Sequence, residues 1–147
     1  MMLAILVYLC SIILDCIDGA VARALKKTSK WGSFLDSFSD RISDGLIIWS
    51  LTYFNIVSQS LVFLELMGAY LVSYIRAKGE SLGLRMESIG IAERAERLIL
   101  ILVILIFVKV MPLISTLTFY ILLIATYITV AQRVVYVKQK LVKGVGR

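Results

Sequence analysis

Long apolar runs separated by short charged stretches dominate the chain, and their lengths predict membrane helices. A helix that spans a bilayer needs about 20 mainly apolar residues. Five segments approach or reach this length, at about residues 1–23, 31–54, 58–75, 97–111 and 110–132. The pattern therefore predicts an all-α integral membrane protein, a polytopic helix bundle with five spans that forms a single domain over residues 1–147.

The first segment crosses a bilayer only if it carries charge into the membrane. It has 14 uncharged residues before Asp15, so a full span requires the helix to continue to about Arg23. Asp15 and Asp18 then lie inside the span, near its end. The segment has no basic start and no small-residue cleavage site, so it is not a signal peptide.

The connections between segments predict the topology. Residues 77–96 are polar and contain three glycines, which predicts a loop with room for a short helix on the membrane surface. This connection and residues 24–31 and 133–147 fall on one face. Of the 16 Lys and Arg residues, only Lys109 approaches the other face. The positive-inside rule then places the charged face in the cytoplasm.

Composition agrees with a membrane protein. The chain is 60% apolar and 18% charged, with a mean hydropathy of +0.91, against about 45–50% and about a quarter in soluble domains. The net charge of +6 fits attraction to anionic lipids better than nucleic-acid binding. Cys10 and Cys16 support neither a disulfide framework nor a zinc site. Because the chain has no histidine, any metal is expected to bind oxygen ligands, as magnesium and manganese do.

Five aspartates stand out, because charged groups near a membrane helix are costly and usually functional. They are Asp15, Asp18, Asp36, Asp40 and Asp44. Spacings of three and four place each group along one stripe of its helix. Each aspartate alone can be read as a solvated interface residue paired with Arg23 or Arg41. Together, on two antiparallel neighbours, they predict one acidic pocket whose mutual repulsion a pair of divalent metals relieves.

The spacing of these residues resembles a known family signature. Asp15-x-x-Asp18-Gly19-x-x-Ala22-Arg23, then eight residues, then Gly32-x-x-x-Asp36-x-x-x-Asp40 matches the signature of the CDP-alcohol phosphatidyltransferases at every position. The resemblance implies transfer of a lipid-phosphate group from a CDP-linked lipid to an alcohol, with release of CMP. It implies two Mg²⁺ or Mn²⁺ ions held by Asp15, Asp18, Asp36 and Asp40, with Asp40 also the general base. It further assigns the CDP-lipid to Asp15, Gly19, Ala22, Arg23 and Gly32.

Three arginines indicate the acceptor. Arg76, Arg97 and Arg133 stand at helix ends on the charged face, and clustered guanidinium groups suit a doubly charged phosphate. Each can instead be a snorkelling anchor. The pattern, Asp44 included, is similar to the inositol-phosphate branch of the family, the archaetidylinositol phosphate and phosphatidylinositol phosphate synthases, in which basic residues at these places grip the acceptor phosphate. Inositol phosphate is therefore the expected acceptor, the donor being CDP-archaeol or CDP-diacylglycerol, with glycerol 3-phosphate as the alternative acceptor.

Two other functions are alternatives to this one. An ion or proton carrier would distribute acidic residues through the membrane depth, whereas only Glu65 lies at mid-depth. A non-catalytic partner is the second alternative. It is motivated by the start of the chain inside the family's second helix, from which an N-terminal truncation, or a first helix supplied by another chain, is expected. Members of the family are commonly homodimers, so a homodimer is also expected.

Overall fold

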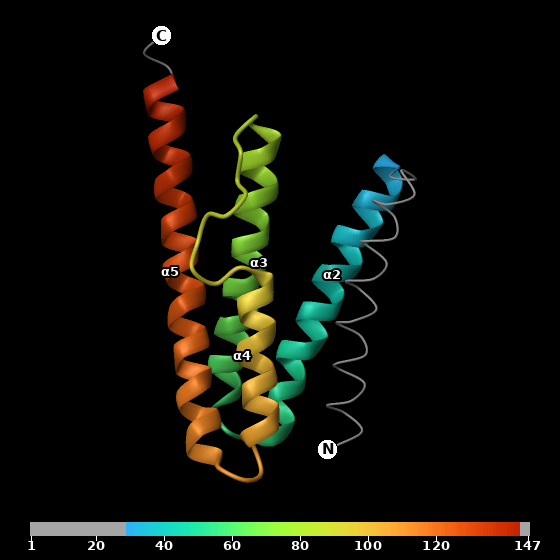
Figure 1. Cartoon of the computed structure of the whole chain (residues 1–147), viewed down its shortest axis with the longest axis vertical. Coiled ribbons are helices and arrows are strands. Elements are labelled where there is room, and N and C mark those ends of the chain that lie inside the picture. The colour runs from blue at the N-terminus through green and yellow to red at the C-terminus, as the bar shows by residue number, and fades with distance from the viewer. Residues whose placement is uncertain (1–28, 145–147) are drawn as a thin grey trace. The chain divides into compact units, whose positions relative to one another are not determined.

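The computed structural model describes residues 29–144, and all regular structure in that range is helical. The elements are α2 (Lys30–Ser50), the short 3₁₀ helix η1 (Leu51–Phe54), α3 (Gln59–Ser81), α4 (Arg94–Phe107) and α5 (Pro112–Gly144) (Figure 1). The chain divides after Asp44 into two compact units. The all-α prediction is confirmed for the described residues.

Local signals explain where the helices begin and end. The Ser29 hydroxyl accepts a hydrogen bond from the Gly32 N–H at 2.9 Å, as an N-cap does at the start of α2. Pro112 opens α5, the position at which a missing N–H is tolerated. α3 ends in a Schellman motif: Gly83 has φ +80°, and the Leu84 N–H donates to the Gly79 carbonyl at 3.1 Å.

Two helices are longer than the apolar pattern predicts. α3 continues to Ser81, six residues past the expected end at 75, because the helix stop is the Gly83 turn rather than the first charges. α5 continues to Gly144 instead of ending at 132. Its basic last turns contain no glycine or proline before Gly144, so nothing in the sequence interrupts the helix. Residues 82–93 form turns and bends without a helix.

α5 is the central helix of the second unit, since it packs against both α3 and α4. Each helix contributes a buried stripe at helical spacing: Val62, Glu65, Gly68, Ala69 and Val72 on α3; Arg97, Ile101 and Ile104 on α4; Phe119, Leu122, Thr126, Thr129 and Arg133 on α5. Buried polar side chains interrupt these largely apolar stripes, among them Glu65, Arg97, Thr126, Thr129 and Arg133. Polar side chains inside a membrane bundle are rare and usually functional.

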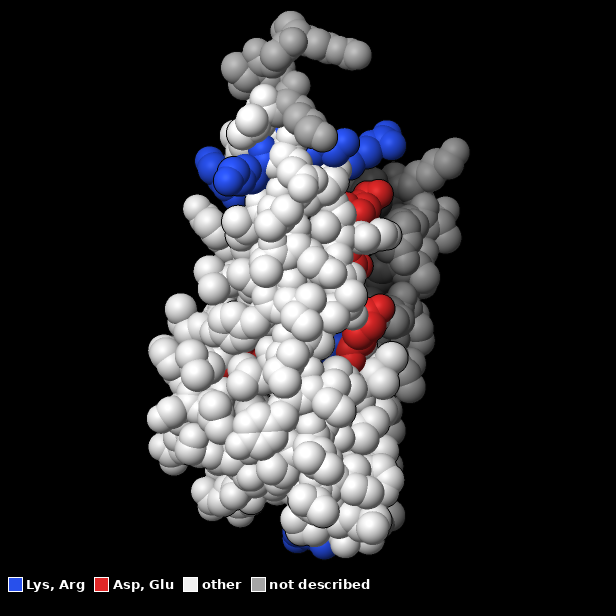
Figure 2. All heavy atoms as spheres, turned by 90° about the vertical axis from the view of Figure 1, so that its left-hand side faces the viewer, with Lys and Arg blue, Asp and Glu red and all other residues white. Residues whose placement is uncertain are grey.

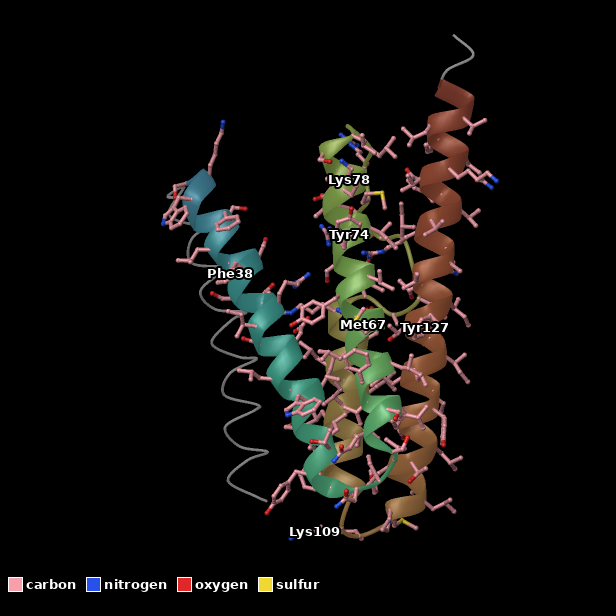
Figure 3. The ribbon with its side chains drawn as sticks, turned by 180° about the vertical axis from the view of Figure 1, so that it is seen from behind. Phe38, Met67, Tyr74, Lys78, Lys109 and Tyr127 are labelled. Atoms are coloured by element: carbon pink, nitrogen blue, oxygen red, sulfur yellow. The ribbon has the colours of Figure 1, made fainter. Side chains whose placement is uncertain are left out.

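The surface of the second unit suits a bilayer. Two helices are long and apolar enough to span one, Gln59–Ser81 and Pro112–Val142. Many large apolar side chains of both helices are exposed, and the face of α5 in Figure 2 is mostly uncharged, with Lys and Arg gathered in a band near one end. Lys138 and Lys140 are exposed in the last turns of α5. Lys78 and Lys109 lie at opposite ends of the bundle (Figure 3). The exposed lysines named here therefore lie toward the ends of the bundle, whereas Glu65, Arg97 and Arg133 are buried inside it.

Close packing of α3 on α5 depends on Gly68. A Cβ atom at this position would lie 2.8 Å from Thr126 Cγ2, closer than real Cβ atoms approach. The Thr126 side chain is β-branched and its hydroxyl donates to Glu65 Oε1 at 2.9 Å, so it cannot rotate away without breaking that bond. Small residues that allow such approach are common between membrane helices.

Gly68→Ala is therefore expected to lower the free energy of unfolding by about 1–3 kcal/mol, the usual cost of overpacking. Thermal unfolding of the detergent-solubilised protein measures this loss. Ala77→Leu adds more bulk on the same helix at an exposed position and should leave the midpoint within error. A higher midpoint for Gly68→Ala would show that helix propensity outweighs the contact.

Candidate functional site

α2 has two chemically different faces. Asp36, Asp40 and Asp44 follow at intervals of four, so their carboxylates lie along one side of the helix. Trp31, Phe34 and Phe38 lie on the opposite side and stack in sequence, with ring centroids 5.6 and 6.2 Å apart. Only the acidic face offers the oxygen ligands that Mg²⁺ and Mn²⁺ prefer.

The acidic face is described only in part. Asp36 is exposed, Asp40 is half-buried, and the Arg41 guanidinium lies 3.5 Å from an Asp40 carboxylate oxygen. Gly32 lies in the first turn of α2, where an added Cβ would come within 3.1 Å of the Ser29 hydroxyl. The remaining signature residues lie outside the described range: Asp15, Asp18, Gly19, Ala22 and Arg23. Within residues 29–144 no three acidic, cysteine or histidine side chains form a metal cluster.

The segment that joins α3 to α4 runs down the side of α5 (Figure 1). Three α5 side chains form hydrogen bonds with its backbone at successive points along the segment. Tyr136 donates to the Arg85 carbonyl at 3.1 Å, Arg133 donates to the Ile89 carbonyl at 2.7 Å, and Thr129 accepts from the Ala92 N–H at 2.9 Å. The seven residues from Tyr136 to Thr129 correspond to about 10 Å of helix. Residues 82–93 therefore bring the start of α4 about two turns into the bundle.

Non-helical backbone at this depth needs partners from the protein. Its conformation is also special: Ser88 has φ +56° and Gly90 has φ +121°. A Cβ at Gly90 would overlap the Thr129 methyl group. Met86 and Ala92 are fully buried. The segment is thus packed tightly against α5.

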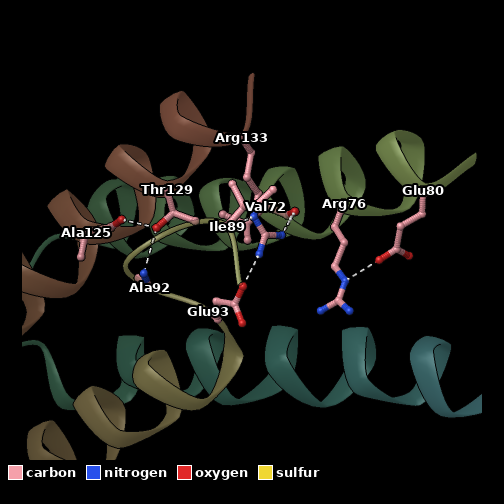
Figure 4. Close-up of polar contacts among 9 residues, drawn as sticks. All are labelled: Val72, Arg76, Glu80, Ile89, Ala92, Glu93, Ala125, Thr129 and Arg133. Carbon is pink, nitrogen blue, oxygen red and sulfur yellow. Dashed lines mark hydrogen bonds and ion pairs between the residues drawn. The ribbon is translucent and has the colours of Figure 1, made fainter. Parts of the chain in front are cut away.

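Arg133 is the main anchor of this segment. Its side chain is 2% exposed. Besides the bond from Nε to Ile89, one terminal nitrogen donates to the Val72 carbonyl at 2.8 Å and the other pairs with Glu93 Oε1 at 3.1 Å (Figure 4). A guanidinium has five N–H groups, so two remain without a partner among the described residues. The side chain is therefore fixed in place by bonds to α3 and to the connecting segment.

The other two predicted acceptor residues lie on the neighbouring helices. Arg76 on α3 is exposed and pairs with Glu80 at 2.9 Å (Figure 4). It is close enough to Arg133 for the two positive charges to act on each other. Arg97 is buried in the first turn of α4. The structure therefore brings Arg76 and Arg133 into one region, and the connecting segment sets the depth of Arg97.

Glu65 is buried deeper in the same polar region. It is fully buried, Oε1 accepts the Thr126 hydroxyl at 2.9 Å, and Oε2 has no hydrogen-bond partner among the described residues. Arg97 is close enough to interact with it electrostatically. A buried carboxyl beside a buried guanidinium reduces the cost of holding both in the bundle.

Glu93, Thr126 and Thr129 also belong to this region, and none of them is predicted as a site residue from the sequence. A signal was present, because Thr126, Thr129 and Arg133 follow at spacings of three and four within an otherwise apolar helix. Such a stripe faces one side of a helix. Its partners in a distant segment could not be read from the pattern.

Comparison with known proteins gives consistent results. Residues 1–131 match the family model described as CDP-alcohol phosphatidyltransferase. The chain is 42% identical to the archaetidylinositol phosphate synthase of Pyrococcus horikoshii, over 89% of this chain and 67% of that protein. It is 36% identical to the phosphatidylinositol phosphate synthase of Streptomyces avermitilis, over 86% of this chain and 57% of that protein.

The fold is also similar to solved structures. The phosphatidylinositol phosphate synthase of Mycobacterium tuberculosis with CDP-DAG bound aligns with a TM-score of 0.72 and 31% identity, over 86% of this chain and 68% of that chain. The same enzyme in complex with manganese and citrate gives the same score over 65% of its length. The chain thus spans about two thirds of the length of these relatives.

Arg133→Lys should release the connecting segment, because one ammonium group cannot replace three bonds that leave a planar fork in fixed directions. We expect amide hydrogen exchange of residues 84–93 to become at least about tenfold faster. This factor corresponds to the net free energy that one or more hydrogen bonds contribute. Hydrogen exchange with mass spectrometry in detergent measures it. Arg76→Lys is the matched control at an exposed position and should leave this exchange unchanged. Unaltered hydrogen exchange in Arg133→Lys would show that Arg133 does not anchor the connecting segment.

Proposed function

The chain belongs to the CDP-alcohol phosphatidyltransferase family, and we propose that it transfers the lipid-phosphate group of a CDP-lipid to inositol phosphate, releasing CMP. The reaction forms a bond between an inositol hydroxyl oxygen and the lipid-attached phosphorus and breaks the bond from that phosphorus to CMP. The hydroxyl proton goes to a carboxylate. The lipid donor is CDP-archaeol or CDP-diacylglycerol, the two donors that the names and titles of the relatives suggest.

Arg133 is the residue that supports a phosphate-bearing acceptor most directly. A guanidinium held by Ile89, Val72 and Glu93, with two N–H groups not bonded to these residues, has its orientation fixed before a phosphate binds. Fixed charged donors of this kind bind a dianion more strongly than a neutral or zwitterionic alcohol. Arg76 and Arg97 are proposed to complete the phosphate site.

Glycerol 3-phosphate is the alternative acceptor, since its phosphate would satisfy the same arginines. The relatives support inositol phosphate instead, because synthases of phosphoinositol phosphate lipids recur among them at 36–45% identity. A direct comparison of the two acceptors decides between them.

The carboxylates of α2 fit a divalent metal by the chemistry of the donor set. They supply oxygen alone, at one-turn spacing, and manganese accompanies the related enzyme of Mycobacterium tuberculosis. We assign Asp15, Asp18, Asp36 and Asp40 to two Mg²⁺ or Mn²⁺ ions, which when bound would neutralise the diphosphate and stabilise departing CMP.

The remaining signature residues have separate roles in the proposal. Asp40 accepts the proton of the attacking hydroxyl, because a carboxylate crowded by others holds a proton more readily than an isolated one. The residues proposed to bind the donor are Asp15, Gly19, Ala22, Arg23 and Gly32.

The proposal includes a topology. Five spans, with α4 and the descending segment together forming one crossing, put the arginines of the proposed acceptor site toward the end of the bundle that is rich in Lys and Arg. That end faces the cytoplasm by the positive-inside rule, where water-soluble inositol phosphate and CMP are exchanged. A homodimer, the common assembly of the family, is part of the same proposal.

Asp40→Asn should lower turnover about 10²- to 10⁴-fold, the usual contribution of a general base. CMP release from a CDP-lipid with inositol phosphate measures this loss. Glu87→Gln makes the same carboxyl-to-amide change at an exposed position of the connecting segment and should keep wild-type turnover. Full activity in Asp40→Asn would remove this residue from the mechanism.

Arg97→Ala should raise the KM for inositol phosphate about 10- to 100-fold, because a charge-assisted bond to phosphate is lost. The KM for the CDP-lipid should stay within about twofold of wild type, since the donor is assigned to other residues. Arg85→Ala, at an exposed arginine whose carbonyl accepts a hydrogen bond from Tyr136, is the control. Equal changes in both KM values would contradict the assignment of Arg97 to the acceptor.

A further inference from the structure

The polar stripe of α5 contains one hydroxyl that is bonded on both sides. Thr129 Oγ1 accepts the Ala92 N–H at 2.9 Å and donates to the Ala125 carbonyl at 2.9 Å (Figure 4). Both residues of the first bond are buried, Thr129 at 0% and Ala92 at 1% exposure. Since Ala92 is 37 residues from Thr129 in sequence, the bond fixes two distant segments against each other.

The place of Ala92 gives this bond its importance. Glu93, the next residue, is the N-cap of α4 and pairs with Arg133. The Arg97 N–H donates to the Glu93 carbonyl at 3.2 Å in the first turn of α4. A tether at Ala92 therefore fixes the depth at which α4 begins. It also fixes the position of the Glu93 side chain, which pairs with Arg133.

Packing on the other side of the threonine supports the same conclusion. The Thr129 methyl group fills the space beside Gly90, where φ is +121° and a Cβ would overlap that methyl. Thr129 thus contacts the connecting segment twice, through its methyl at Gly90 and through its hydroxyl at Ala92. The two contacts can be separated by substitution.

We infer that Thr129 is a positioning residue for acceptor binding: its hydroxyl holds the Ala92 N–H and thereby places Arg97 and the Glu93–Arg133 pair around the acceptor phosphate. The inference rests on the proposed function and adds to it a residue that contacts no substrate. Loss of the hydroxyl leaves a buried N–H group without a partner, and the segment moves to find water or another acceptor.

Substitutions at Thr129 separate the hydroxyl from the methyl. Thr129→Val keeps the shape and removes the oxygen, whereas Thr129→Ser keeps the oxygen and removes the methyl. We expect Thr129→Val to raise the KM for inositol phosphate about tenfold, the effect of one unsatisfied buried N–H, with the KM for the CDP-lipid unchanged. Thr129→Ser should behave like wild type in both. A packing role alone would reverse this order, and that result would overturn the inference.

A second pair of variants keeps the test valid if Thr129→Val does not fold. Thr129→Ser and Thr129→Ala differ only in the hydroxyl, so the alanine variant should show the higher KM for inositol phosphate. Equal KM values in this pair would refute the inference. A parallel rise in both substrates' KM values, together with a lower unfolding midpoint, would also refute it, since general destabilisation then explains the effect.

Failure of the proposed function would give a different experimental result. Wild-type protein that turns over no inositol phosphate refutes the acceptor and leaves the tether to be tested by structure. Hydrogen exchange at Ala92 then decides: faster exchange in Thr129→Val than in Thr129→Ser supports the tether, and equal exchange overturns it.

Discussion

Backbone polar groups that enter an apolar bundle must find partners there, and this constraint organises the second unit. The connecting segment carries carbonyl and N–H groups about two helical turns below the end of α3, where each unsatisfied group costs several kcal/mol. α5 supplies the partners from one stripe: Thr129, Arg133 and Tyr136. The helix thus stabilises an irregular segment that could not lie at this depth alone.

The same contacts prepare the proposed acceptor site. Arg133 is fixed by the segment it anchors, and it retains two N–H groups for a phosphate. Preorganised donors avoid the cost of ordering flexible side chains on binding. Glu93 pairs with Arg133, and Glu65 lies close to Arg97, so both arginines have an acidic neighbour in the bundle before a substrate arrives. Structural stability and the proposed anion binding therefore rely on the same side chains.

Much of the fold followed from the length of apolar runs, and the family followed from eight residues at fixed gaps. Helix ends were less accurate, because the Schellman turn at Gly83 and the absence of a breaker before Gly144 outweighed the charges expected to end α3 and α5. The depth of residues 82–93 was not predictable, since it depends on bonds across 37 to 51 residues of sequence. Arg133 was predicted as a phosphate ligand, which stays a prediction, but its anchoring role required coordinates.

The central claim is that α5 holds the connecting segment inside the bundle at Thr129. A single cysteine tests it directly, in a background with Cys10 and Cys16 changed to serine. Ala92 is 1% exposed, so Ala92→Cys should react slowly with a maleimide in membranes. Adding Thr129→Val should speed this reaction, whereas adding Thr129→Ser should not. Equal rates in the two double variants would contradict the account.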